Sequence, residues 1–400
     1  MWIAAVVQRG AVPAQPVRAA LHVQAVNLLA MSRPTGFDDP LIISRLILGW
    51  YDAHRRELPW RETSDPWAIL VSEIMLQQTT VAAVVPYYER FLKRWPCPAD
   101  LAAAAQDELL AEWAGLGYYG RAHRLQAAAQ VVAEAGGVLP ETRQALLHLP
   151  GIGDYTAAAV ASIAFGEAVA AIDGNVERVL CRFLAEEANP RQAATRRRLR
   201  ELAETWLDPD RPGDSNQGLI ELGATVCRPR SPHCHVCPLA DRCQALAMGD
   251  PERFPRLPPR RATVRVTLVA AVIQRRGRWL MSHREAGPNK GFAEWPSVTV
   301  PSERCDDRGR PLDSCAEWLS QLADVHGLGV RPQELLDALR HTITHHRITV
   351  YPFAARLISG RLSGSLFWWQ PERQTPPLTT AARRILSAVT PTAENTETAP

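Results

Sequence analysis

The chain has 400 residues, and 46% of them are hydrophobic, which is enough for two or three domains with packed cores. A formal net charge of +3 is too small to indicate a nucleic-acid partner by itself, and it does not exclude one, because phosphate contacts depend on local patches and helix ends. No apolar run approaches a membrane span, since the run Leu41–Trp50 is short and contains Arg45.

Residues 1–36 lack the features of a secretory signal, because the apolar stretch Trp2–Val7 is too short and no basic leader precedes it. Translation could start at Met31 instead of Met1. We therefore expect residues 1–36 to be a disordered extension, or to lie outside the native protein.

Residues 37–248 carry a succession of helical patterns and almost no strand signals, which predicts an all-α domain. Asp65 and Pro66 mark one helix start, since aspartate is a favoured N-cap and proline suits the first helical position. We expect this helix to span Pro66–Gln77. The other expected helices cover about 41–57, 80–94, 106–115, 120–135, 141–148, 154–165, 175–187, 191–206 and 215–226.

Residues 249–262 are rich in proline and arginine without periodicity, and they predict a stiff, basic linker. A second domain of α+β type follows at 263–372, and residues 373–400 resemble a disordered tail. The expected elements of the second domain are strands at Val264–Ile273, Arg278–Ser282 and Ile348–Leu357 and a helix at Cys315–His326.

The run Leu149–Thr156 joins two expected helices through the glycines Gly151 and Gly153. Glycine lets the backbone approach a ligand closely, and the free N–H groups that open the second helix favour an anion such as a phosphate. A tight helix–helix turn without a ligand is the plain alternative.

Two carboxylates have contrasting surroundings. Glu73 falls on the apolar stripe of the helix Pro66–Gln77, where burial would raise its pKa and keep it neutral as a general acid. Asp173 precedes a helix whose N–H groups and dipole would keep it ionised. Cleavage of a glycosidic bond uses such a pair. The alternatives are a glutamate paired with a buried arginine and a simple N-cap. Tyr155, in the first turn after the hairpin, could be core or could line a cleft beside Asp173.

Four of the eight cysteines lie in the pattern Cys227-x6-Cys234-x2-Cys237-x5-Cys243. Such crowding without a secretory signal argues for metal binding, as an iron–sulfur cluster or as zinc. Zinc ribbons usually show two C-x2-C pairs and this chain has one, so the spacing favours a cluster.

Together these segments make the chain similar to the helix–hairpin–helix DNA glycosylase superfamily, and within it to the MutY-type family of adenine DNA glycosylases. The resemblance covers about residues 38–372. It implies an all-α helix–hairpin–helix domain with a [4Fe-4S] module at 227–243 and a Nudix-like C-terminal domain. Its motifs are Leu58–Arg61, Ser72–Thr79, Gly115–Tyr119, Leu149–Thr156, Asp173–Val176 and the cysteine spacing.

The resemblance also implies residue roles in a monofunctional glycosylase of base excision repair. Glu73 would protonate adenine, and Asp173 would stabilise the sugar cation with support from Tyr155 and Asn175. The expected contacts to the flipped adenine and to DNA are Arg56, Leu58, Trp60, Arg61, Gln78, Thr79, Tyr118, Gly151, Gly153 and Glu221, and the expected cluster ligands are Cys227, Cys234, Cys237 and Cys243. The partner would be duplex DNA with adenine opposite 8-oxoguanine or guanine, bound by a monomer in a bacterial-type cytoplasm or nucleoid.

Two departures bear on this expectation. Endonuclease III carries lysine where this chain has Tyr155, which points to base removal without strand cleavage. The family's Phe-Ser-His loop for 8-oxoguanine is Ile343-Thr344-His345 here, so Thr344 and His345 keep the polar groups and the aromatic is lost. The alternatives are a bifunctional endonuclease III-like glycosylase and lyase, and a non-catalytic iron–sulfur DNA-binding protein.

Overall fold

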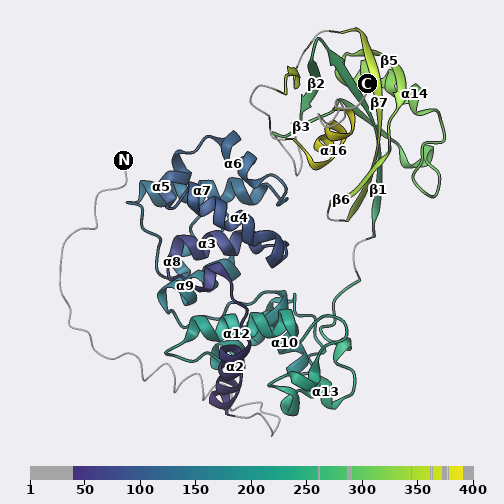
Figure 1. The fold of residues 1–400 in the computed structure, drawn as a ribbon. Coiled ribbons are helices and arrows are strands. Elements are labelled where there is room, and N and C mark those ends of the chain that lie inside the picture. The colour runs from purple at the N-terminus through teal and green to yellow at the C-terminus, as the bar shows by residue number, and fades with distance from the viewer. Residues whose placement is uncertain are drawn as a thin grey trace, which may run out of the picture.

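The structure is a computed structural model that describes residues 39–259, 262–285, 291–343, 345–360, 362, 364–371, 376 and 378–390. Its helical part precedes a mixed α/β part, as the sequence predicts (Figure 1). No helix in these ranges has the length and apolarity that crossing a membrane requires. The expectations for residues 1–36 lie outside the described residues.

Two hydrophobic cores build the helical part. One is formed mainly by the chain from Leu58 to Val169, and the other joins the first helix to the region from Ala170 onward. The helices are α2 (Pro40–His54), α3 (Pro66–Leu76), α4 (Val81–Arg94), α5 (Pro98–Ala103), α6 (Gln106–Trp113), α7 (Gly120–Glu134), α8 (Arg143–Leu146), α9 (Asp154–Phe165), α10 (Gly174–Phe183), α11 (Ala193–Thr205), α12 (Pro212–Thr225) and α13 (Gln244–Ala247). All ten expected helices are present, whereas α5 and α13 were not predicted because they are too short to show a period.

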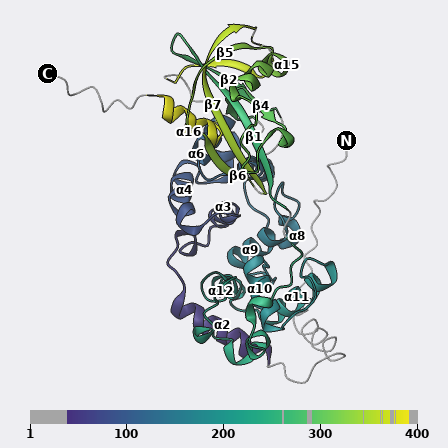
Figure 2. The same ribbon diagram turned by 90° about the vertical axis from the view of Figure 1, so that its right-hand side faces the viewer.

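The chain returns to its start in the second core. Ile43 and Ile47 of α2 pack in the same cluster as Leu219 and Leu222 of α12, and Figure 2 shows the two helices adjacent at the lower end of the molecule. Gly218 permits this approach, because a Cβ there would lie 2.9 Å from a methyl group of Ile47. The N-cap prediction for α3 is confirmed, since Asp65 accepts a hydrogen bond from the Trp67 N–H over 3.0 Å.

The C-terminal part is a mixed sheet with helices on both faces, which agrees with the predicted α+β class. The strand order is β3-β2-β1-β7-β5, with β4 beside β1, β6 beside β7 and β8 beside β2, and β1 runs parallel to β7. The strands are β1 (Val264–Arg275), β2 (Arg278–His283), β3 (Ala293–Glu294), β4 (Ser297–Val300), β5 (Gly329–Leu335), β6 (Leu339–Ile343), β7 (His346–Ser359) and β8 (Leu366–Trp369).

Three expectations need correction. The helix expected at Cys315–His326 is broken into α14 (Cys315–Trp318), a 3-10 turn and α15 (Leu322–His326). The segment expected to be a disordered tail contains α16 (Thr380–Val389), because Ala382 and Ile385 are buried in a core on one sheet face. The linker expected at 249–262 is anchored at its start, since Phe254 is fully buried in the second helical core.

The helical and mixed parts also touch directly. Phe292, just before β3, is buried in the first helical core, and its ring centroid lies 4.0 Å from that of Tyr119. The contact places the C-terminal domain beside the turn between α6 and α7.

Candidate active site

One cavity of about 750 Å³ receives side chains from several helices of both helical cores. Glu73, Tyr155, Asp173 and Asn175 all line it, and so do the other site candidates Arg56, Leu58, Trp60, Arg61, Gln78, Thr79, Gly151, Gly153 and Glu221. The sequence predicted the four catalytic candidates on three separate helices. Their convergence is the property that an active site requires.

Glu73 is an acid held in an apolar wall. Its helix α3 is buried along nearly its whole length, and Glu73 itself is only 7% exposed. Burial raises its pKa from 4.5 to about 7, while the Tyr155 hydroxyl lowers it and the Asp173 charge raises it further. Its Oε2 has no hydrogen-bond partner among the described residues. The carboxyl group can therefore carry a proton near neutral pH and still has a free oxygen.

Asp173 has the opposite environment. Its Oδ1 accepts the N–H groups of Asn175 and Val176, each over 2.8 Å, and its Oδ2 accepts from Asn175 Nδ2 over 2.7 Å. These bonds favour the charged form, as predicted from its place before a helix. Burial is nevertheless the larger effect, so the pKa of Asp173 lies above its ordinary value and not below it.

Asn175 is oriented by a residue that the sequence did not single out. Arg178 Nη2 donates to Asn175 Oδ1 over 2.8 Å, which turns the amide nitrogen toward Asp173. The same guanidinium donates from Nε to the Cys227 carbonyl over 2.7 Å. The spacing of three residues within one helix is the only local signal that could have indicated this pair.

Tyr155 is partly buried and lines the cavity with both carboxylates. Burial, and then the charges of Glu73 and Asp173, raise its pKa well above the ordinary value, so its hydroxyl remains a donor. Among the residues that line the cavity in the described part of the chain, none is a lysine. The full sequence contains two lysines, Lys93 and Lys290, and Lys93 lies exposed in the last turn of α4.

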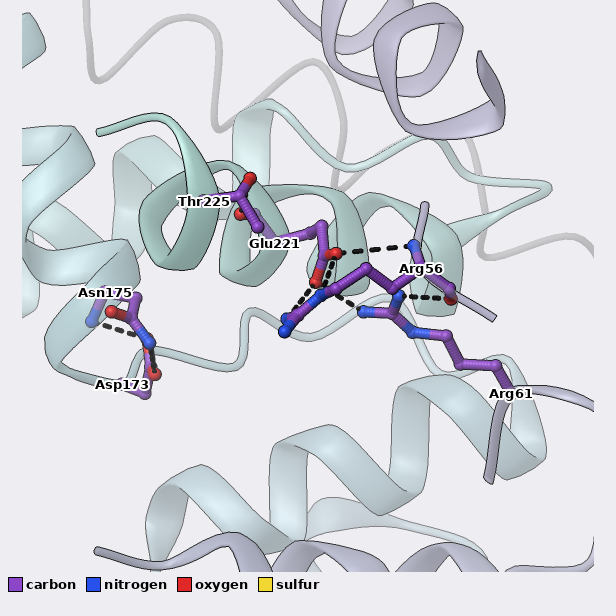
Figure 3. Close-up of polar contacts among 6 residues, drawn as sticks. All are labelled: Arg56, Arg61, Asp173, Asn175, Glu221 and Thr225. Carbon is purple, nitrogen blue, oxygen red and sulfur yellow. Dashed lines mark hydrogen bonds and ion pairs between the residues drawn. The ribbon is translucent and has the colours of Figure 1, made fainter. Parts of the chain in front are cut away.

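A buried ion cluster forms another wall of the cavity (Figure 3). Glu221 is 1% exposed and accepts from Arg56 Nε over 2.6 Å and from Arg61 Nη2 over 2.9 Å. Burial alone would raise the pKa of Glu221, but the hydrogen bonds from the two arginines outweigh it and lower the pKa. Leu58 and Trp60, between the two arginines in sequence, are buried in the first helical core.

The hairpin turn lies at the edge of the same cavity. Gly151 has φ of 75°, and an added Cβ would lie 2.5 Å from the Arg124 side chain. Gly153 caps α9 with extended backbone, and Asp154 in the first turn pairs with Arg143 and Arg200. The left-handed backbone and the close contact with Arg124 therefore require glycine at 151, and its approach to a ligand stays a prediction.

Gln78 and Tyr118, the residues expected to enter the duplex, both have left-handed backbone with φ of 59° and 50°. Such conformations cluster at functional sites. Arg121, which is 3% exposed, connects the two turns by donating to the carbonyl oxygens of Met75 and Gly117. Tyr118 is 46% exposed and lies outside the cavity lining, and the Arg121 guanidinium lies 5.5 Å from its ring centroid.

His345, one of the two residues expected to read 8-oxoguanine, is not among the residues that line this cavity. Thr344 lies outside the described residues. His345 is described, and its ring centroid lies 4.1 Å from that of His346 at the start of β7.

The four cysteines gather at the edge of the second helical core. Cys227, Cys237 and Cys243 pack against it, and the four thiols influence one another electrostatically. Burial raises the pKa of Cys237 to about 12, and a bound metal centre is what stabilises such thiolates.

Arg182 fixes the cysteine loop in place. It is 2% exposed, and its guanidinium donates to the carbonyl oxygens of Arg228, Pro229 and Phe254 over 2.6, 2.9 and 3.1 Å. Its Nη1 also lies 3.4 Å from Cys227 Sγ. A donor aimed at a thiolate is the kind of contact that tunes an iron–sulfur centre.

Comparison with known proteins identifies the family of the helical domain and of the cysteine loop. A model of the HhH-GPD superfamily base excision DNA repair proteins matches residues 71–205, and a model of the iron–sulfur binding domain of endonuclease III matches residues 227–243. Adenine DNA glycosylase from Homo sapiens is 35% identical over 401 residues, covering 85% of this chain and 72% of that protein. The adenine DNA glycosylase of Mycolicibacterium smegmatis is 44% identical over 208 residues, covering 51% of this chain and 70% of the relative.

A solved MutT Nudix hydrolase from Burkholderia pseudomallei aligns with 32% of this chain and 98% of its own, at 21% identity and a TM-score of 0.26. The fold and the site define a helix–hairpin–helix protein of base excision DNA repair, with the binding domain for a [4Fe-4S] cluster. Within that class, the chain belongs to the adenine DNA glycosylase family.

Proposed function

We propose that this protein is a monofunctional DNA glycosylase that hydrolyses the N-glycosidic bond of adenine paired with 8-oxoguanine or guanine in duplex DNA. The observation that carries the proposal is that Glu73, with its raised pKa, and Asp173 share one cavity. Family membership supports adenine as the base. Such an enzyme works at the DNA in the cytoplasm or nucleoid, and we infer that it acts as a monomer.

The adenine must leave the base stack to reach the cavity, at a cost of a few kcal/mol. The hairpin at Gly151 would bind a backbone phosphate, and the exposed Gln78 and Tyr118 would occupy the opened stack. The Glu221 cluster, with Leu58 and Trp60, would form the wall against the flipped base.

Glu73 then donates its proton to the adenine, which weakens the C1′–N9 bond, and the Tyr155 hydroxyl holds the resulting carboxylate. Asp173 stabilises the positive sugar while Asn175 and Arg178 hold the carboxylate in place. Water adds to the sugar and completes hydrolysis. The cluster, when bound, would organise the cysteine loop for DNA.

None of the described residues that line the cavity is a lysine, which argues against the bifunctional alternative because a Schiff base needs an amine. Thr344 and His345 are the proposed readers of 8-oxoguanine in the C-terminal domain.

The test is adenine release from duplexes that carry adenine opposite 8-oxoguanine, guanine, cytosine or thymine, with and without alkali. We expect release with the first two, and strand breaks only after alkali. Glu73→Gln and Asp173→Asn should abolish release, while the exposed control Glu89→Gln should not. Borohydride trapping of a protein–DNA adduct would favour the lyase, and normal repair in cells carrying both neutralised carboxylates would favour a non-catalytic DNA-binding protein.

A further inference from the structure

A second cavity, of about 650 Å³, lies in the C-terminal domain at the end of the sheet where β1 begins and β6 turns into β7. Its charge is strongly one-sided. Arginine supplies five of its lining residues, and Asp307 is the only acid among them. The arginines are Arg265, Arg308, Arg310, Arg340 and Arg347.

Strand register puts three of these arginines on one sheet face. Arg265 of β1 pairs directly with Arg347 of β7, and Arg340 of β6 pairs with Thr349, two residues further along β7. Side chains alternate between faces, so residues two apart share a face. Adjacent strands lie about 4.8 Å apart, and like charges directly opposite are destabilising. The fold therefore keeps a repulsive arginine pair at this position.

The other two arginines come from a loop that lies over the same face. Thr267 Oγ1 donates to the Gly309 carbonyl over 2.8 Å and so ties the loop to β1. Asp306 Oδ1 accepts the backbone N–H groups of Arg308 and Arg310 over 2.8 and 2.7 Å. The Asp306 carboxylate, next to the cavity-lining Asp307 in sequence, is thus occupied by the backbone of the loop.

The five guanidinium groups remain available. All five residues are exposed, and none has a side-chain hydrogen bond or ion pair to another described residue. Guanidinium groups match phosphate oxygens with two parallel hydrogen bonds. A cavity with five such groups and one carboxylate suits a ligand with more than one phosphate.

We propose that this cavity binds consecutive backbone phosphates of the DNA strand that meets the turn between β6 and β7. The turn carries His345, and Thr342 and Arg347 on its two sides both line the cavity. A strand that presents a base to the turn would therefore pass its phosphates over the arginines. The inference rests on the proposed function in taking DNA as the ligand, but it needs no catalysis.

The test compares Arg265→Gln/Arg347→Gln with a matched control. Arg331 of β5 and Arg356 of β7 form a second pair of exposed arginines opposite each other in the same sheet, and neither lines the cavity. The dissociation constant for an undamaged duplex and for one with adenine opposite 8-oxoguanine is measured across about 50 to 200 mM salt.

The salt slope is the slope of the logarithm of the binding constant against the logarithm of the salt concentration. Removing two phosphate contacts should reduce the magnitude of this salt slope by about 2 and weaken binding roughly tenfold for both duplexes. Arg331→Gln/Arg356→Gln should keep the wild-type slope. If the first double variant does not fold, as judged by its thermal midpoint, Arg308→Gln/Arg310→Gln on the loop replaces it.

Equal slopes for the cavity variant and the control would overturn the proposal. So would loss of inorganic pyrophosphate binding without any change in DNA affinity, because the cavity would then be a site for free anions. Failure of the wild-type protein to release adenine would contradict the proposed function alone, since the salt slope is measured on binding.

Discussion

Asn175 holds Asp173 at both carboxylate oxygens, with its backbone N–H on Oδ1 over 2.8 Å and its Nδ2 on Oδ2 over 2.7 Å. These bonds oppose the burial that raises the pKa of Asp173. Arg178 fixes the direction of the amide and also contacts the cysteine loop at the Cys227 carbonyl. The charge on Asp173 therefore depends on packing between α10 and the loop.

Asn175→Ala tests this dependence. Loss of the Nδ2 donor should raise the pKa of Asp173 further, because a hydrogen bond to a charged group contributes about 1.5 kcal/mol. Asp173 must be ionised to stabilise the sugar cation, so the acidic limb of the rate profile should move to higher pH by about one unit, with roughly tenfold slower release below it. Single-turnover adenine release across pH measures this, with Asn189→Ala, a half-buried asparagine outside the cavity lining, as the control. An unchanged limb would exclude the role of Asn175.

The raised pKa of Glu73 makes predictions for both stability and rate. Its folded value is about 7 against an ordinary 4.5, so the stability it contributes is fully present below about pH 4.5 and is lost as pH rises through 7. The full loss corresponds to about 3 kcal/mol.

Glu73→Gln cannot ionise, and it should therefore exceed the wild type in stability by about 3 kcal/mol at pH 8 and by less than about 1 kcal/mol at pH 5, although it releases no adenine. Thermal midpoints at the two pH values measure the difference. An equal gain at both would mean that packing, and not ionisation, is responsible. In the wild type, adenine release should fall as pH rises above about 7, because the acid loses its proton.

Substitution of Glu221, at the centre of the ion cluster, should cost far more folding stability than substitution of Arg56, at its exposed edge. Glu221→Gln leaves the guanidinium of Arg61, whose side chain is 6% exposed, without a counter-charge, which should cost about 3 kcal/mol. Arg56→Ala removes a partner that is 41% exposed, so solvent screening should limit its cost to less than about 1 kcal/mol. Chemical unfolding of the two variants gives the comparison. Similar losses of stability in the two variants would mean that Arg56 contributes as much as the buried pair of Arg61 and Glu221.

Gly151 and Gly153 offer a matched pair in the hairpin. Alanine at 151 would need left-handed backbone and would overlap the Arg124 side chain, so Gly151→Ala should cost at least about 2 kcal/mol and weaken DNA binding. Gly153 has ordinary φ and open space around its Cα, so Gly153→Ala should cost less than about 1 kcal/mol. Unfolding and duplex affinity are measured together. Equal effects would show that the strained turn is not what positions the phosphate.

The sequence predicted the local parts of the site well. The apolar stripe of α3 predicted that Glu73 is buried, and the Asp-Gly-Asn run predicted that Asp173 caps α10. N-cap preference and apolar periodicity extend over only one or two helical turns, so a short stretch of sequence is enough to detect them. The missed helix α16 has the same apolar period, but its threonine- and proline-rich surroundings suggested disorder.

Contacts between residues far apart in the sequence could not be predicted from such local patterns. Residue spacing alone gave no reason to join Arg56 to Glu221, which are 165 positions apart, and the pair was expected at one site only through family resemblance. The pairing of Arg265 with Arg347 likewise depends on the register of two strands separated by most of the C-terminal domain.

The sequence by itself determined most of the longer helices, which carboxylates they carry and which cysteines gather in one loop, because those features depend on neighbours along the chain. Only the tertiary structure decided that Glu73 and Asp173 share a cavity and that burial raises the pKa of both. Desolvation and charge coupling depend on what surrounds a group in space, and packing between distant helices sets that environment.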